Sequence, residues 1–336
     1  MTTTRTTLAE IAAEAGVAVS TVSKVLNGHS DVAAATRVRI ERLLSRRGYR
    51  RSPVARRPAR TGVIDLVVDE PDSPWGLAVL PGVAEAAEES GLGVLVSARR
   101  PDILLPRGSQ GAVLAVSALT DRQRTGLDRR AIPFVLVHGA GQAHRDAPSI
   151  GATDFAGGCA ATEHLIALGH RRIGMIGGPD RLPPARARRA GHGAALGAAG
   201  LPADPELIRT GDLTHAGGLE AAAALLALPD PPTAIFAADD LQAGGVYEAA
   251  RRSGRTIPGD LSVVGFGDLP YARWLAPPLT TVRQPLHEMG VTATRTLLRL
   301  LNDERLESPR VELATVLVTR ASTAAVRRGT RSAGSP

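Results

Sequence analysis

Short polar side chains and one lysine share a face of a helix predicted near the N-terminus of the 336-residue chain. This helix is expected over Val19 to Asn27, with Val22 and Val25 turned inward. The outward positions are Ser20, Thr21, Ser23, Lys24 and Asn27. Side chains of this size reach base edges and phosphates in the major groove of DNA. The packing residues alone are equally compatible with a helical bundle that has no partner.

A second set of polar and aromatic residues is expected to follow β-strands further along the chain. Aromatic rings bind the apolar faces of sugars, and carboxylates and arginines bind paired hydroxyls. The candidates for contact with such a ligand are Trp75, Asp154, Phe155, Arg186, Arg188, Asp239 and Asp268. Several also have a structural interpretation. Trp75 fits a buried interface aromatic, Asp154 and Asp240 fit helix N-caps, and Arg186 fits a surface ion pair.

Motifs that would indicate an enzyme are missing from the sequence. We find no GxGxxG after the first strand, no GxxxxGK[ST], no GxSxG and no HExxH. The pairs His164/His170 and His138/His144 have no cysteine or carboxylate at metal-ligand spacing. The only cysteine, Cys159, lies among alanines, where a buried inert thiol is expected. The sequence therefore predicts no enzyme activity, no cofactor and no metal.

Positive charge is concentrated in the first 60 residues, which hold 12 Lys and Arg against four acids. The remaining 276 residues are almost balanced, with 28 basic and 29 acidic side chains. A basic segment on a neutral body is typical of a protein that binds a polyanion. No signal peptide is recognisable, and no apolar run approaches the ~18 residues that span a membrane. We expect a cytoplasmic protein with no membrane partner.

Three short helices are predicted to position the polar face. Thr7 and Glu10 form a capping box that starts the first helix, and Gly16 ends it. After a short turn the second helix begins at Val19, and a third is expected over Ala34 to Arg47. This spacing is that of a helix-turn-helix, which we assign to residues 1–49.

From residue 61 onward, apolar strands alternate with helices. This order predicts an α/β fold of two doubly wound lobes, with ligand sites at the carboxyl ends of the strands. The predicted strands are Val63–Val68, Gly93–Val96, Ala112–Val116, Phe134–Val137, Arg172–Ile176, Leu207–Arg209, Ala234–Ala237, Ser262–Gly265 and Val311–Val318. The predicted helices are Pro81–Ser90, Gly157–Leu168, Ala185–Ala199, Gly217–Leu228, Leu241–Ser253 and Leu286–Asn302.

The run TLAEIAAEAGVAVSTVSKVLNG, followed by TRVRIERLLSRRGYR, resembles the headpiece of the lactose-repressor (LacI) family. The later segments GHRRI, LSVVGF and PLTTVRQP resemble the periplasmic-binding-protein-like sensor of the same family. The resemblance implies a homodimer that binds double-stranded operator DNA and a small effector, most plausibly a carbohydrate.

The resemblance also implies roles for individual residues. Val19 and Ser20 match positions that select bases, and Lys24 matches a contact to phosphate or guanine. Thr7 is also expected to contact DNA. Arg188 matches an effector-binding arginine, and Asp239 a position often held by an effector-binding asparagine. Gly267 stands where relatives commonly have a ligand-binding aspartate, which leaves Asp268 as the next carboxylate.

Residues 50–60 are predicted to form a basic hinge between the headpiece and the sensor. The family resemblance implies a hinge helix here with a leucine that wedges into the minor groove, and Pro58 occupies that position. Proline in a helix removes one backbone hydrogen bond, so the helix cannot exceed about one turn. Two interpretations remain. Pro58 itself inserts between base steps, or Arg56 and Arg57 belong to a mobile cationic tether.

The sensor is assigned to residues 61–322, and the resemblance implies that the chain crosses between its lobes three times. The N-lobe is expected over about 61–153 and 282–310, and the C-lobe over about 154–281 and 311–322. Residues 323–336 are predicted to form a disordered tail. Only about 15 residues separate the strands ending at Val96 and beginning at Ala112, so one layer of the N-lobe is expected to be thin.

Together these features predict a sequence-specific transcriptional regulator, most plausibly a repressor, controlled by a small ligand between two lobes. The alternative from another class is a sugar-binding protein or an enzyme without a role on DNA.

Overall fold

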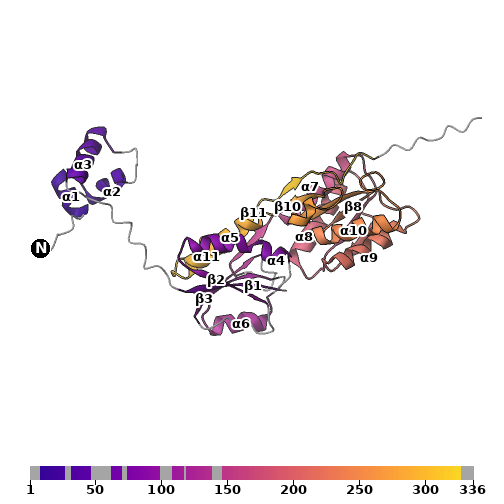
Figure 1. Ribbon diagram of the computed structural model, residues 1–336, viewed down its shortest axis with the longest axis horizontal. Helices are drawn as coiled ribbons and strands as arrows, with labels where there is room; N and C mark the ends of the chain where they lie inside the picture. The colour runs from indigo at the N-terminus through magenta and orange to yellow at the C-terminus, as the bar shows by residue number, and fades with distance from the viewer. Residues whose placement is uncertain are drawn as a thin grey trace, which may run out of the picture. The chain divides into compact units, whose positions relative to one another are not determined.

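The computed structural model describes residues 8–26, 32–46, 62–69, 74–98, 108–116, 119–137 and 146–326. The chain divides into two compact units, residues 1–59 and residues 60–336. In the described parts the first unit is helical, and the second holds two β-sheets with helices packed on both faces (Figure 1).

The N-terminal unit consists of three helices around a small core. They are α1 (Leu8–Ala15), α2 (Val19–Leu26) and α3 (Ala34–Arg46). The buried residues of this core are Ile11, Ala12, Ala15, Val22, Val25 and Ile40. Gly16 has a φ of +63° and turns the chain so that the amide of Val17 bonds the carbonyl of Ala12 at 3.0 Å. The predicted helix-turn-helix fold is confirmed.

The N-lobe contains a parallel six-stranded sheet in the order β11-β5-β4-β3-β1-β2. Its strands are β1 (Val63–Val68), β2 (Gly93–Ala98), β3 (Ser109–Ala115), β4 (Phe134–Val137), β5 (Ser149–Ala152) and β11 (Arg310–Leu313). Helices α5 (Leu80–Glu88) and α11 (Leu286–Leu300) cover one face, and α6 (Asp121–Arg129) lies on the other (Figure 1). The short helix α4 (Pro74–Ala78) precedes α5.

The C-lobe repeats this plan with a sheet in the order β12-β10-β9-β8-β6-β7. The strands are β6 (Ile173–Gly177), β7 (Ile208–Thr210), β8 (Ala234–Ala237), β9 (Ser262–Gly267), β10 (Thr280–Arg283) and β12 (Val316–Val318), with only β12 antiparallel. The helices are α7 (Asp154–Ala167), α8 (Pro183–Ala198), α9 (His215–Leu226) and α10 (Asp240–Arg252), with 3₁₀ turns η2 (Pro205–Leu207) and η3 (Pro270–Arg273). The core clusters place α7 and α8 on one face and α9 and α10 on the other. The predicted doubly wound α/β lobes are confirmed.

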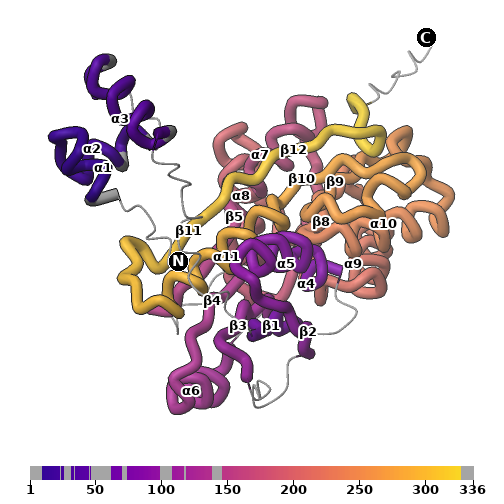
Figure 2. Tube along the Cα trace, turned by 60° about the vertical axis from the view of Figure 1, so that its left-hand side comes forward, coloured from indigo at the N-terminus to yellow at the C-terminus, as the bar shows by residue number. Residues whose placement is uncertain are grey.

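In the described part of the chain, three segments join the lobes. They lie between β5 and α7, between β10 and α11, and between β11 and β12. Figure 2 follows the last of these, in yellow, from β11 to β12. The first and third run side by side, because the amide of Thr315 donates to Oγ1 of Thr153 at 2.9 Å and the amide of Thr153 donates to the carbonyl of Leu313 at 3.0 Å.

The C-terminal part of the sensor differs from the prediction. The single strand expected over 311–318 is two strands in different sheets, because the amide of Thr315 bonds Thr153 instead of continuing a ladder. The lobe boundaries also differ from the prediction. Residues 282 and 283 pair with β9 in the C-lobe sheet, and residues 311–313 pair with β5 in the N-lobe sheet. Part of the predicted disordered tail is also ordered. The amide of Ala324 bonds Ser262 Oγ at 3.1 Å, and that of Val326 bonds the carbonyl of Leu168 at 3.0 Å.

The thin layer predicted in the N-lobe has a counterpart at the sheet edge. Only ten residues separate β2 from β3, and residues 99–107 lie outside the described part. Leu95 and Val96 on β2 are each 40% exposed, which is high for strand residues of a parallel sheet.

Three helix pairs pack backbone against backbone through glycines. A Cβ on Gly82 of α5 would overlap the carbonyl of His287 of α11, and one on Gly290 would overlap that of Val79. The same reciprocal arrangement joins α7 to α8 and α9 to α10, through Gly158, Gly191, Gly218 and Gly245. These contacts hold each pair of helices closer than larger side chains would allow.

Candidate functional site

A cavity of about 160 Å³ lies between the two lobes of the sensor. Its walls are Asp69, Pro74 and Trp75 from the N-lobe and Leu182, Pro184, Ala185, Arg188, Leu213, Asp239, Leu241 and Leu269 from the C-lobe. Most of these residues come soon after the carboxyl ends of β1, β6, β8 and β9. Ligands of doubly wound sheets bind at this end of the strands, so the cavity has the expected location for an effector.

Arg188, on α8, is the only basic residue among the described residues of the cavity wall, and neighbouring protein groups fix its position. Its Nε donates to Oδ1 of Asp154 at 2.8 Å, and its Nη1 donates to the carbonyl of Ala238 at 2.7 Å. The guanidinium carbon lies 3.8 Å from the centre of the Phe266 ring, within cation–π range. Its Nη2 also lies 2.8 Å from Asp154 Oδ1 but has no hydrogen-bond acceptor among the described residues. Nη2 can therefore donate to a ligand oxygen.

Asp239 contributes a carboxylate to the same cavity from the start of α10. It is the N-cap of that helix, and its Oδ1 accepts the amide of Leu241 at 2.7 Å. Burial raises the pKa of Asp239 to about 6, even though the cap and the charge of Arg188 favour its ionised form.

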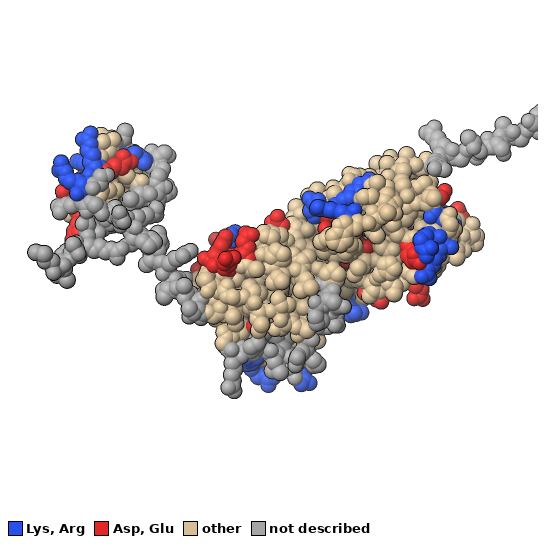
Figure 3. All heavy atoms as spheres, in the orientation of Figure 1, with Lys and Arg blue, Asp and Glu red and all other residues tan. Residues whose placement is uncertain are grey.

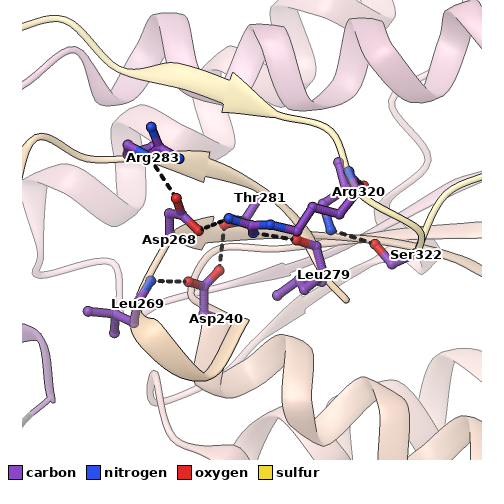
Figure 4. A network of polar contacts seen from close by, with 9 residues as sticks. Asp240, Asp268, Leu269, Leu279, Thr281, Arg283, Arg320 and Ser322 are labelled. Carbon is purple, nitrogen blue, oxygen red and sulfur yellow. Dashed lines mark hydrogen bonds and ion pairs between the residues drawn. The ribbon is translucent and has the colours of Figure 1, made fainter. Parts of the chain in front are cut away.

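Asp240 is fully buried beneath the cavity wall and serves the structure. It accepts hydrogen bonds from the hydroxyl of Thr281 and from the amide of Leu269 at 2.9 Å (Figure 4). Burial raises the pKa of Asp240 to about 7. Through these bonds Asp240 holds the loop that brings Leu269 to the cavity.

Asp268, contrary to the prediction, does not line the cavity. Its side chain is only 1% exposed and lies between Arg283, whose Nε is 2.7 Å from Oδ2, and the guanidinium of Arg320 (Figure 4). The physical reason is the backbone. Gly267 and Asp268 have φ values of +131° and +56°, so the turn directs the carboxylate toward the two arginines.

The remaining predicted effector residues lie in different places. Trp75 lines the cavity and also packs against the N-lobe core. Asp154 holds Arg188 from behind. Phe155, half exposed, lines a separate hollow of about 390 Å³ beside β11. Arg186 is exposed and donates to the backbone carbonyl of Asp180 at 2.7 Å, so it does not reach the cavity.

Several cavity residues were not predicted from the sequence. Asp69 directly follows the buried strand β1, a signal that the sequence offered. The leucines on the wall gave no such signal, because an apolar residue in a loop usually indicates a contact with the protein core rather than with a ligand. They are Leu182, Leu213, Leu241 and Leu269.

The predicted DNA-binding residues lie mostly on α2 or outside the described residues. Val19 is 47% exposed, Ser20 and Lys24 are exposed, and Thr21 is partly exposed. Ser23 lies on α2, but its side chain is not described. Thr7, Asn27, Arg56, Arg57 and Pro58 fall outside the described ranges. Helix α3 adds four arginines, and Figure 3 shows Lys and Arg side chains gathered on the drawn face of this unit.

No group of three or more His, Cys, Asp or Glu among the described residues could hold a metal ion. No described helix is long and apolar enough to cross a membrane.

Comparison with known proteins gives consistent matches over most of the chain. Residues 7–52 match the family model of bacterial regulatory proteins, lacI family, and residues 162–323 match a periplasmic binding protein-like domain. The HTH-type transcriptional regulator MalR of Streptomyces coelicolor is 36% identical over 95% of this chain and 97% of its own. The HTH-type transcriptional repressor CytR of Escherichia coli K12 is 30% identical over 96% and 98%.

Solved structures of regulatory proteins also match this chain over most of its length. A complex of the transcriptional regulator CelR with cellobiose has a TM-score of 0.72 and 33% identity, covering 95% of this chain and 100% of that one. The lac repressor dimer bound to operator and the anti-inducer ONPF has a TM-score of 0.69 and 27% identity, covering 96% and 100%.

Proposed function

The chain belongs to the lacI family of bacterial regulatory proteins, and from this we infer that it is a sequence-specific DNA-binding regulator of transcription. We propose that a small sugar-like ligand in the cavity between the lobes controls it. The observation that carries this proposal is the cavity itself, which combines Trp75, Asp239 and Arg188 on walls from both lobes. An aromatic face beside a carboxylate and a guanidinium suits a polyhydroxylated ring.

On the DNA side, we propose that residues 1–49 form the reading head and residues 50–60 the hinge. Helix α2 enters the major groove, with Val19, Ser20 and Thr21 near base edges and Lys24 on phosphate or guanine. Thr7, Ser23 and Asn27 support the same interface, and Arg56, Arg57 and Pro58 act in the hinge. A homodimer then reads two half-sites about one helical turn apart, or a multiple of it, as an inverted repeat.

On the ligand side, control requires that the ligand prefers one arrangement of the lobes. Because the cavity walls come from both lobes, a ligand there stabilises the closed arrangement by bridging Trp75 to Arg188 and Asp239. The three connecting segments let the lobes rotate as bodies while they remain linked. We place this activity in the cytoplasm, where operator DNA is, and assign no enzymatic step to it.

The DNA-binding proposal is tested by selection of random duplexes on the full-length protein, followed by sequencing. An inverted repeat is the expected result, and recovery of unrelated sequences would contradict the proposal. Lys24→Ala should weaken operator binding and lower the salt slope by roughly one if the contact is to phosphate.

Lys24 also offers a direct footprint, because it is the only lysine in the chain. An amine-acetylating reagent therefore has two targets, Lys24 and the N-terminal amine. Operator DNA should protect Lys24 from acetylation, and a scrambled duplex should not. Equal acetylation with both duplexes would remove Lys24 from the interface.

The ligand proposal is tested by titrating a panel of sugars into the full-length protein. A sugar that binds should change operator affinity, and Arg188→Ala should abolish both effects. The matched control is Arg189→Ala, next along α8, which pairs with the exposed Asp180. A ligand that binds Arg188→Ala as tightly as the wild type occupies another site.

A further inference from the structure

The ionisable groups on the cavity wall are unequal in charge. Among the lining residues that the structure describes, Asp69 and Asp239 contribute carboxylates, and Arg188 contributes the single guanidinium. The balance of these groups indicates what kind of ligand the cavity accepts, an inference that rests on the function proposed above.

The positive charge of Arg188 is already compensated by protein. Both Nε and Nη2 lie 2.8 Å from Asp154 Oδ1, in an ion pair whose side chains are only 5% and 8% exposed. A buried pair of this kind leaves little net charge to attract an anion. What Arg188 offers a ligand is the donor capacity of Nη2, which suits a hydroxyl or ring oxygen.

The negative charge of Asp239 is compensated less fully than that of Asp154. Among the described residues Asp239 forms no ion pair, and its Oδ1 accepts the backbone amide of Leu241. Arg188, whose charge favours the ionised form of Asp239, is itself paired with Asp154. An ionised carboxylate in a mostly apolar cavity is costly unless a cation reaches it, and burial accordingly raises the pKa of Asp239 to about 6.

The rest of the wall is apolar, with one aromatic ring. Eight of the eleven lining residues are Pro, Trp, Leu or Ala, and Trp75 supplies the flat surface. The volume of about 160 Å³ is below the ~300–1,000 Å³ of sites for drug-sized ligands. The ligand is therefore a single small ring with one apolar face.

We propose that the effector is an amino sugar, a polyhydroxylated ring whose ammonium group pairs with the carboxylate of Asp239. Its apolar face stacks on Trp75, and a ring or hydroxyl oxygen accepts a hydrogen bond from Nη2 of Arg188. Acidic and phosphorylated sugars are rejected, because a second anion would meet the carboxylates of Asp69 and Asp239. The one cation among the described lining residues, Arg188, is already paired with Asp154.

Calorimetric titration of the full-length protein at neutral pH tests this proposal. The probes are D-glucosamine, D-galactosamine and D-mannosamine, each against its neutral parent hexose, with N-acetyl-D-glucosamine and D-glucose 6-phosphate alongside. At least one amine should bind about 10-fold more tightly than its parent, a difference of about 1.4 kcal/mol. The acetylated and phosphorylated sugars should bind more weakly than the amines.

The Asp239→Asn variant removes the negative charge but keeps the N-cap of α10, because asparagine is as good an N-cap as aspartate. It should reduce the ratio between amine and parent sugar to about one. Asp230→Asn is the matched control, since it removes the same charge from a side chain that is 83% exposed, and it should keep the wild-type ratio. If Asp239→Asn does not fold, Asp69→Asn tests the same charge balance and should reduce the ratio.

Three results would overturn the amino-sugar assignment. They are equal or tighter binding of a neutral or phosphorylated sugar, an unchanged ratio in Asp239→Asn, and no binding by any of the three amines at millimolar concentration. A neutral sugar that binds as tightly as the amines and shifts operator affinity would overturn the amino-sugar assignment. It would leave the proposal of a ligand-controlled regulator intact. Failure to select any operator sequence would instead contradict the proposed function.

Discussion

Asp154, in the first turn of α7, holds Arg188 of α8 in an ion pair that is almost fully removed from solvent. The contact is possible because the two helices approach closely, with Gly158 lying against the backbone of Arg188. This carboxylate, together with the carbonyl of Ala238, fixes the direction in which the guanidinium reaches the cavity.

Removal of this carboxylate should be far more harmful than removal of an exposed one. Asp154→Ala leaves a buried guanidinium without a counterion, and we expect a loss of about 3–5 kcal/mol in the free energy of unfolding. The control is Asp180→Ala, which breaks the exposed pair with Arg189 and should cost about 1 kcal/mol or less. Urea unfolding followed by circular dichroism measures both. Similar losses in the two variants would show that the buried ion pair contributes no more to stability than the exposed one.

Asp240 should make the protein less stable as the pH rises toward neutrality. Its pKa is about 7 in the folded protein, against 3.8 for the unperturbed group. Between these values the folded state holds a proton that the unfolded state has released, so stability falls as pH increases, by at most about 1.4 kcal/mol per unit. Asp240→Asn should flatten this slope, because its amide can donate to Thr281 while its oxygen accepts from Leu269. Melting temperatures between pH 5 and pH 8 are the measurement.

Asp239, whose pKa burial also raises, remains in the Asp240→Asn variant, so some slope should persist. Asp230→Asn, at an exposed site, is the matched control and should keep the wild-type profile. If Asp240→Asn keeps the full wild-type slope of stability against pH, another group causes the pH dependence.

Two glycine substitutions on helices should have opposite effects. Gly82→Ala places a Cβ on the carbonyl of His287, which forces α5 and α11 apart and should cost about 1–3 kcal/mol. Gly193→Ala on α8 meets nothing within 4 Å and should stabilise by about 0.5–1 kcal/mol through a lower backbone entropy of the unfolded chain. Thermal unfolding distinguishes them, and a stabilising Gly82→Ala would contradict the close contact.

The headpiece helices should gain stability from better N-caps. α2 and α3 begin directly after Ala18 and Ala33, whose carbonyls accept helical amides but whose side chains cannot cap. Ala18→Ser and Ala33→Ser should each add about 1 kcal/mol to a fragment of residues 1–59, which forms a compact unit of its own. Chemical denaturation gives the values. Unchanged stability in both variants would mean that another residue, such as Ser20, already caps the helix.

Strong local signals made much of the fold predictable. The capping and glycine signals of the headpiece gave its three helices, and continuous apolar runs gave central strands such as β1 and β9. The missed strands β5 and β10 are short and contain Ser, Gly or Thr, so they have no apolar run. Helix α6 is mostly polar and was also missed, although the capping box between Thr120 and Gln123 that starts it is visible in the sequence.

The candidate site was only partly predictable, because loop position does not fix side-chain direction. The loops after β8 and β9 were both expected at the cavity. Asp239 faces it, whereas the left-handed turn at Asp268 points that carboxylate at two arginines. Which chain segments lie opposite a loop is a property of the whole fold, and no local pattern contains it.

The crossing from β11 to β12 has a consequence for how this protein is made. The N-lobe sheet lacks its edge strand, and its core lacks α11, until the ribosome has read about 160 residues beyond β5. At about 5–20 residues per second, this is a delay on the order of 10–30 s. During that time Ile64, Leu66 and Val83 have no Met289 or Leu297 to pack against. A nascent or truncated chain therefore exposes an unfinished apolar face, to which a chaperone would be expected to bind before the last strand arrives.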